Sequence, residues 1–436
     1  LLDDFRLACL SRETSLLGRK EVLTGKAKFG IFGDGKELAQ IALSKYFKKG
    51  DFRSGYYRDQ TIMMALDLLN VREYFAALYA HVDIEHEPAS GGRQMGGHYA
   101  TRSLDEKGEW KNLMEQYNSS ADISPTAGQM PRLLGLAQAS KVYRALDLEH
   151  LSSFSQKGNE IAFGTIGDAS TSEGLFWETM NAASVLQVPM VMSVWDDGYG
   201  ISVPKKFQTT KESISEALSG FEKTTNTNGL KIFRVKGWNY PELLMTYDKA
   251  TRVAREEHIP VLVHVEDMTQ PQGHSTSGSH ERYKTPERLK WAEEFDCINK
   301  FKEFLVLEGT ASEKELDEIR KAAKKEVRQL QKEAWSDFRK SIDSERDQAV
   351  AWLDELEKEH PSDDIQSLVK GLKSNSEPIR KEIFNAVRKS LRLTLGSNAS
   401  SRTGMKGWLD QIYPKKQADY SSHLYSHSAR ATDQIS

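Results

Sequence analysis

The chain has 436 residues, which is enough for one large buried core and an extension. Its 60 lysines and arginines nearly balance 63 aspartates and glutamates, and the net charge of −3 gives no overall field that would attract nucleic acid or an acidic membrane surface. The apolar stretches are far shorter than a membrane span requires, so the composition predicts a soluble protein.

The number of cysteines indicates the redox state of the cellular compartment. Two cysteines occur, Cys9 and Cys297, and this number excludes a disulfide framework and a thiolate metal site. It fits a reducing compartment, so we expect the cytoplasm, or the mitochondrial matrix if the source is eukaryotic.

Between about residues 30 and 285, short apolar runs alternate with helical patterns, which predicts an α/β fold with a parallel sheet. Helices are expected between the strands and before the first of them. The expected strands are 161–166, 188–195, 231–235 and 261–265, and the expected helices are 36–47, 173–186 and 241–256.

The composition shifts to charged residues after about residue 286. Apolar side chains at steps of three or four, from Leu316 to Ile342, predict a long amphipathic helix over 310–360, with a capping box of Thr310 and Glu313. A second helix is expected over 377–395, followed by a linker with at most short helical pieces. The expected divisions are an α/β domain (1–285), a charged helical extension (286–395) and a linker or connection to a further domain (396–436).

The strongest chemical signal lies where two expected strands end. Asp168 follows the strand at 161–166, and Asp197 follows the strand at 188–195. Because loops after neighbouring parallel strands form the ligand crevice of such a sheet, we expect the two carboxylates to lie close together. Hard oxygen ligands beside a helix N-terminus suit an Mg²⁺ ion that holds a phosphate.

Glycines beside these aspartates support the metal interpretation. Gly167 allows the backbone to approach a phosphate closely, and Gly198 permits an unusual turn dihedral. A Gly-Asp pair after a strand is more often a plain turn, so the second acidic loop carries the argument. Gly33-Asp34-Gly35 has no strong strand before it, and we interpret it as a cap and turn rather than a metal site.

Further segments follow in a characteristic order. The stretch 167–200 contains Gly-Asp, a helix with Asn181, and then Asp-Asp-Gly-Tyr; the others are 56–59, 92–99, 124–131 and 273–277. Together they resemble the E1 alpha subunit of thiamine diphosphate-dependent 2-oxo acid dehydrogenases, most nearly the branched-chain (2-oxoisovalerate) type. The resemblance covers roughly residues 30–285 and implies the thiamine diphosphate-binding fold, a parallel sheet flanked by helices.

The resemblance also implies roles for individual residues. It makes the side chains of Asp168 and Asp197 and the main-chain carbonyl of Tyr199 the ligands of Mg²⁺. His274 is implied to act on the cofactor and its intermediates as the catalytic residue. The implied cofactor-binding residues are Tyr57, Arg58, Ser124, Thr126, Gly167, Asp168, Ala169, Ser170, Asp197 and His274.

These roles have plainer alternatives. Tyr57 and Arg58 also fit a surface turn, and His274 in its Gly/Ser/Thr loop also fits a solvated side chain. A loop histidine can act as an acid or base, or donate to a developing oxyanion, and His98 and His280 are further candidates.

Four positions depart from the pattern of the family. Asp197 stands where the family usually has Asn. Its carboxylate adds negative charge beside a diphosphate, and only an extra cation would offset that charge. Ala169 replaces a signature glycine, a tolerable change if its backbone angles are ordinary. Trp195 and Gln270 stand where branched-chain relatives often have Arg, so two basic phosphate contacts would be absent.

The resemblance implies oxidative decarboxylation of a 2-oxo acid and reductive acylation of a lipoyl group on an E2 partner. The Glu that protonates the aminopyrimidine comes from the beta half in this family. We therefore expect an E1 beta subunit, or a fused beta half after Ser436, in an alpha2beta2 assembly or a dimer of fused chains. The alternatives are a pyruvate or acetoin E1 alpha subunit and a non-catalytic structural or regulatory homologue; a phosphohydrolase-like module lacks an evident nucleophile or base.

Overall fold

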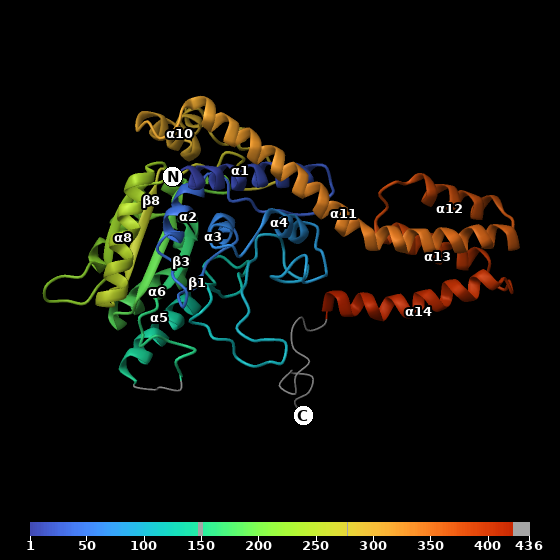
Figure 1. The fold of residues 1–436 in the computed structure, drawn as a ribbon, viewed down its shortest axis with the longest axis horizontal. Helices are drawn as coiled ribbons and strands as arrows, with labels where there is room; N and C mark the ends of the chain where they lie inside the picture. Colours follow the sequence, from blue (N-terminus) through green and yellow to red (C-terminus); the bar gives the residue numbers. More distant parts are fainter. Residues whose placement is uncertain (147–150, 277, 422–436) are drawn as a thin grey trace.

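The computed structural model describes residues 1–146, 151–276 and 278–421 (Figure 1). Its centre is a six-stranded sheet with the order β2-β1-β3-β4-β8-β7, in which every pair of neighbours is parallel. The strands are β1 (Phe52–Ser54), β2 (Asn118–Ser119), β3 (Ala162–Gly167), β4 (Met190–Trp195), β7 (Lys231–Lys236) and β8 (Val261–Glu266). The predicted α/β fold is confirmed, and the four predicted strands are present with small shifts at their ends.

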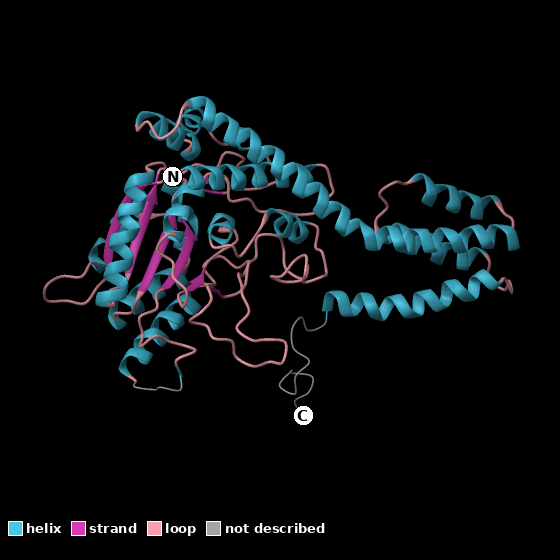
Figure 2. Cartoon of the chain, viewed as in Figure 1, coloured by secondary structure: helices cyan, strands magenta, loops and turns pink. Residues whose placement is uncertain are grey.

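Helices cover both faces of the sheet (Figure 2). α2 (Glu37–Ser44) and α8 (Tyr240–Glu257) share one apolar cluster with the sheet, and α5 (Met130–Ala145) and α6 (Gly174–Leu186) share another. Successive side chains of a strand point to opposite faces, so β4 sends Val191 into the first cluster and Met192 into the second. Burial on both faces explains why these strands are continuous apolar runs.

A buried ion cluster ties β1 to the loops beside it. The Nη2 atom of Arg53 donates to Asp59 Oδ2 at 2.7 Å and to Asp122 Oδ2 at 3.0 Å. Asp59 also accepts a hydrogen bond from the hydroxyl of Thr165 on β3. All of these side chains are buried, and the cluster fixes the loop 56–59 against the sheet.

Helices from both ends of the chain pack together on one side of the α/β domain. These helices are α1 (Leu2–Leu23), α3 (Gln60–Ala65), α4 (Val71–Leu78), α10 (Cys297–Leu307) and the first part of α11 (Glu313–Glu359). The helix α9 (Pro286–Glu294) precedes α10 in the chain. Arg12 of α1 donates to Glu37 Oε1 and to Asp296 Oδ2, each at 2.7 Å, and so joins α1 to α2 and to the start of α10.

The second part of α11 supports a separate apolar cluster with α12 (Asp363–Ser374), α13 (Arg380–Leu393) and α14 (Ser400–Ser421). Figure 1 shows this group extending away from the sheet. Ala349, Leu353 and Leu356 of α11 are fully buried in it. Among the described residues, no helix is both long enough and apolar enough to cross a membrane.

Two predictions for this region were wrong. The capping box of α11 is formed by Ser312 and Glu315, not by Thr310 and Glu313, because Thr310 is still bonded through its backbone N–H to the Leu305 carbonyl behind it. The linker predicted after residue 396 contains the 22-residue helix α14, which buries Met405 in the extension. Residues 422–436 of the predicted linker lie outside the described ranges.

Replacing Arg53 by Met will lower the free energy of unfolding by about 3–5 kcal/mol, because Asp59 and Asp122 are left buried without their cation. Urea denaturation will measure the loss. The matched control is Arg234→Met, which breaks a half-exposed pair with Glu266 and is expected to cost less than about 1 kcal/mol. Equal losses in the two variants would contradict the structural role of Arg53.

Candidate functional site

The ends of β3 and β4 form one edge of the sheet. The two strands are paired with Gly167 opposite Trp195, so the residues that follow each strand leave the sheet side by side. Asp168 begins the short helix η2 (Asp168–Ser172), and Asp197 lies in the turn before β5 (Tyr199–Gly200) and β6 (Val203–Pro204). The expectation that the two loops share an edge is confirmed.

Asp168 is buried, and its Oδ2 has no hydrogen-bond partner among the residues that the structure describes. Burial raises the pKa of this carboxyl well above its usual range, and the charges of Asp196 and Asp197 raise it further. An anionic Asp168 is thus costly in the chain alone, and a cation bound at Oδ2 would remove this cost.

Asp197 has the opposite environment. Its Oδ2 accepts a hydrogen bond from Lys36 Nζ at 2.6 Å and lies 3.1 Å from His274 Nε2. Burial alone would raise the pKa of Asp197, but His274 and Lys36 outweigh it and hold the pKa well below its usual range. Within the described part of the chain, Asp197 Oδ1 accepts one long bond of 3.3 Å, from the Tyr199 N–H, so lone pairs of this oxygen stay available.

Asp196 is a third buried carboxylate at this edge that the sequence analysis did not single out. Its Oδ2 lies 2.9 Å from His264 Nε2 of β8 and 2.8 Å from Lys205 Nζ, and its Oδ1 accepts from the Gly198 N–H at 2.9 Å. The adjacent Asp-Asp pair in the sequence was a usable signal. Its partners were not, because β8 and Lys205 approach Asp196 only in the folded chain.

The other predicted segments meet near the same edge. Arg58 donates from Nη2 to the His274 carbonyl at 3.1 Å and from Nη1 to the Phe32 carbonyl at 2.6 Å. Gln129, which follows Thr126, donates to the Thr165 carbonyl of β3 at 2.9 Å and so places the 124–131 segment beside the strand.

His98 joins two of these segments. Its Nε2 lies 2.9 Å from Ser124 Oγ, and its ring centroid is 6.2 Å from that of Tyr57. Ser124 and Thr126 are exposed, whereas His98 is buried. His280 lies 3.4 Å from Glu281 within its own short helix. Asn181 is exposed on α6.

The structure shows the surroundings of the residues that depart from the family pattern. Ala169 is absent from the residues with positive φ, so its backbone does not require glycine, while Gly198 has a φ of +82° as predicted. The indole of Trp195 is fully buried and contacts Asp59 Oδ1 from Nε1 at 3.4 Å. Gln270 accepts from Lys36 Nζ at 2.8 Å.

The Gly33-Asp34-Gly35 segment forms a turn, as predicted, but it does not cap α2, whose N-cap residue is Lys36. Instead, Asp34 is buried and accepts from Gln270 Nε2 at 2.9 Å and from the Gln272 N–H at 2.8 Å. The turn therefore holds the loop that leads to His274.

A cavity of about 230 Å³ opens beside Asp197 and Tyr199. Arg288 of α9 lines it, donates from Nη2 to the Asp197 carbonyl at 2.9 Å, and lies over the Trp291 ring at 4.0 Å. No local pattern in the sequence indicated this contact, since Arg288 belongs to the charged region after the α/β domain.

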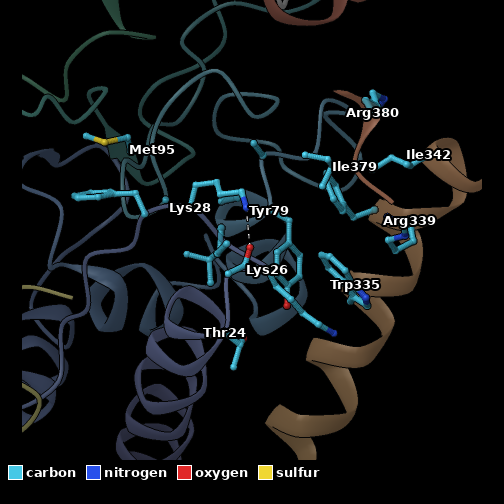
Figure 3. Close-up of a pocket in the computed structure, with 18 of the residues that line it drawn as sticks. Thr24, Lys26, Lys28, Tyr79, Met95, Trp335, Arg339, Ile342, Ile379 and Arg380 are labelled. Carbon is cyan, nitrogen blue, oxygen red and sulfur yellow. Dashed lines mark hydrogen bonds between the residues drawn. The ribbon is translucent and has the colours of Figure 1, made fainter. Parts of the chain in front are cut away.

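A larger cavity, of about 680 Å³, lies between the α/β domain and the helical extension (Figure 3). Lys26 lies over the Trp335 ring at 4.5 Å and 3.7 Å from Glu377, and Trp335 Nε1 donates to Glu377 at 3.0 Å. These contacts join the two parts of the chain, and the cavity is not at the sheet edge that carries the three aspartates.

The residues at the sheet edge fit a magnesium-bound diphosphate in two respects. Asp168 offers a buried oxygen without a partner, and a Cβ added to Gly167 would meet only the Tyr56 hydroxyl, at 3.8 Å, which leaves the backbone approachable. Within the described ranges, no three side chains of His, Cys, Asp or Glu are grouped to hold a metal ion. A metal site here therefore depends on two carboxylates and the Tyr199 carbonyl.

Comparison of the sequence with known proteins places the chain in a family. The model of the dehydrogenase E1 component matches residues 7–342. The 2-oxoisovalerate dehydrogenase subunit alpha of Bacillus subtilis (strain 168) is 26% identical over 339 residues, which are 76% of this chain and 88% of the relative. The mitochondrial subunits of Mus musculus and Dictyostelium discoideum are 25% and 27% identical over 70% and 73% of this chain, which spans 60% and 64% of their lengths. The chain therefore belongs to the dehydrogenase E1 component family.

Proposed function

We propose that this chain is the thiamine diphosphate-binding alpha half of an E1 component that acts on a branched-chain 2-oxo acid. The observation that carries the proposal is the buried, unpartnered Oδ2 of Asp168 beside the turn that holds Asp197. The names of the three relatives support the substrate class. The activity is oxidative decarboxylation of the 2-oxo acid and reductive acylation of a lipoyl group on an E2 partner.

Thiamine diphosphate supplies a carbanion at its thiazolium ring when it is bound. Asp168, Asp197 and the Tyr199 carbonyl would hold Mg²⁺, which neutralises the diphosphate and fixes its position. Ser124 and Thr126 would hold the aminopyrimidine. The remaining residues assigned to cofactor binding are Tyr57, Arg58, Gly167, Ala169 and Ser170.

His274 has the surroundings of a proton-transfer residue. Its Nε2 lies 3.1 Å from Asp197 Oδ2, while its Nδ1 is buried without a partner. Burial lowers the pKa of His274, and Asp197 only partly counters this. Arg58 orients the loop through the His274 carbonyl. His274 is therefore the residue assigned to move a proton on substrate-derived intermediates.

Exposed apolar side chains occur in the segments that follow β3 and β4. Leu175, Ile201, Val203 and Phe207 are 39%, 63%, 42% and 73% exposed. The support for a protein partner comes from the relatives, which are named as alpha subunits. We assign to the beta half the glutamate that the proposed reaction requires.

Of the two alternative functions, one has a specific observation in its favour. A pyruvate or acetoin E1 alpha subunit has the same cofactor chemistry and differs only in substrate. A non-catalytic homologue is favoured by one observation, the salt bridge of Lys36 to Asp197, which already engages a predicted metal ligand. Binding of the cofactor discriminates between an enzyme and a scaffold.

Asp168→Ala and Asp197→Ala will each weaken thiamine diphosphate binding at saturating Mg²⁺ by at least about tenfold, because each removes an oxygen ligand. Isothermal titration of the complete E1 assembly, this chain with its beta partner, will measure the affinity. Asp248→Ala, which removes an exposed carboxylate of α8, is the control and should bind as the wild type does. Wild-type affinity in both site variants, or binding that ignores Mg²⁺, would exclude the proposed metal site.

His274→Ala will leave cofactor affinity unchanged and lower kcat by about 10²–10⁴-fold, the usual contribution of a positioned acid or base. Steady-state turnover and titration on the same preparation will separate the two effects. His280→Ala is the control and should retain turnover near the wild-type value. Normal turnover in the His274 variant would end its catalytic assignment.

Turnover of 3-methyl-2-oxobutanoate will exceed that of pyruvate when complete E1 is assayed with both substrates, because the three relatives are named for the branched-chain reaction. Values of kcat/KM for the two substrates will decide. A higher value for pyruvate would reverse the assignment of substrate class and leave the cofactor site unaffected.

A further inference from the structure

Lys36 is a buried lysine whose ammonium group lies among oxygen atoms of the candidate site. Its Nζ donates to Asp197 Oδ2 at 2.6 Å, to the Thr269 carbonyl at 2.8 Å and to Gln270 Oε1 at 2.8 Å. The side chain is 1% exposed and that of Asp197 is 4% exposed. The three acceptors satisfy the three N–H groups of the ammonium.

The local sequence does not favour a lysine here. Lys36 is the N-cap residue of α2, where the partial positive charge of the helix end repels a cation and where its side chain makes no capping bond. Burial adds a desolvation cost. A buried ammonium group at a helix N-terminus needs a nearby anion to offset these costs. Asp197 is the anion that Lys36 contacts.

The turn at Gly35 places Lys36 close to the 269–270 segment. Gly35 has a φ of +89°, and a Cβ on this residue would lie 2.0 Å from the Thr269 carbonyl oxygen. Only glycine allows the turn to approach the 269–270 segment so closely. The close approach brings Nζ of Lys36 to Asp197.

The carboxylates at this edge differ in how they are neutralised. Asp196 contacts His264 and Lys205, whereas Asp168 Oδ2 has no partner. Without Lys36, Asp197 would retain His274 and the long bond from the Tyr199 N–H but would lose the lysine charge, and the uncompensated negative charge would repel an anionic ligand.

We propose that Lys36 is a positioning residue whose charge offsets Asp197, so that the edge can accept a magnesium-bound diphosphate while Asp197 remains an oxygen ligand. This inference rests on the proposed function. It assigns Lys36 an action through Asp197 rather than direct contact with the ligand. The effect of removing the lysine charge must therefore depend on the charge at position 197.

The test uses four forms of the complete E1 assembly: wild type, Lys36→Gln, Asp197→Asn and the double variant. Asn at 197 keeps an oxygen ligand and removes the charge. Thiamine diphosphate is titrated calorimetrically at saturating Mg²⁺. Lys36→Gln is expected to weaken binding by at least about tenfold when residue 197 is Asp, and by less than about threefold when it is Asn. Lys45→Gln, at the other end of α2 and half-exposed, is the matched control and should bind normally.

Equal weakening in both backgrounds would overturn the inference, because Lys36 would then act on the ligand directly or only support the fold. No weakening in either background would also overturn it. If the wild type does not bind thiamine diphosphate, the proposed function fails. The midpoints of urea denaturation of the four ligand-free forms then test whether Lys36 and Asp197 stabilise each other. Lower midpoints in both single variants with recovery in the double variant support it, and additive losses contradict it.

Discussion

Burial of three aspartates at one sheet edge is the constraint on which the site depends, because each buried carboxylate needs a cation or hydrogen-bond donors. The partners come from elements far apart in the chain: Lys36 from the start of α2, Lys205 from the segment after β6 and His264 from β8. The charges of Asp196 and Asp197 are offset only when these elements are packed in their final order, whereas Asp168 Oδ2 has no partner among the described residues. A change that disturbs the packing of the sheet is therefore expected to disturb the site as well.

Much of the α/β domain could be predicted from the sequence, because strands buried on both faces are unbroken apolar runs. Parallel order was then sufficient to bring the loops of Asp168 and Asp197 to one edge. The nearness of His274 to Asp197 was implied only by resemblance, since the loop after β8 has no pattern of its own. The contacts of Lys36 with Asp197 and of Asp196 with His264 could not be predicted. They join residues that are far apart in the sequence and share no local pattern.

The errors in the extension have a different cause. The segment after residue 396 is rich in Gly, Ser, Asn and Lys and contains Pro414, so local propensity favoured a linker. α14 is helical because it packs Met405 and Trp408 on the extension, with the Trp408 and Trp352 rings 5.6 Å apart. Tertiary packing outweighed propensity here. The roles of the individual site residues stay predictions until cofactor binding is measured.

α11 contributes side chains to the apolar cluster that contains α2 and α8 and to the cluster of the extension, and its 47 residues form one helix of about 70 Å. Its first part is clamped by α1 and α4, and its second part carries α12, α13 and α14. No loop interrupts α11 between these two sets of contacts. Any displacement of α12, α13 and α14 would therefore be passed along a rigid helix to its contacts with α1 and α4.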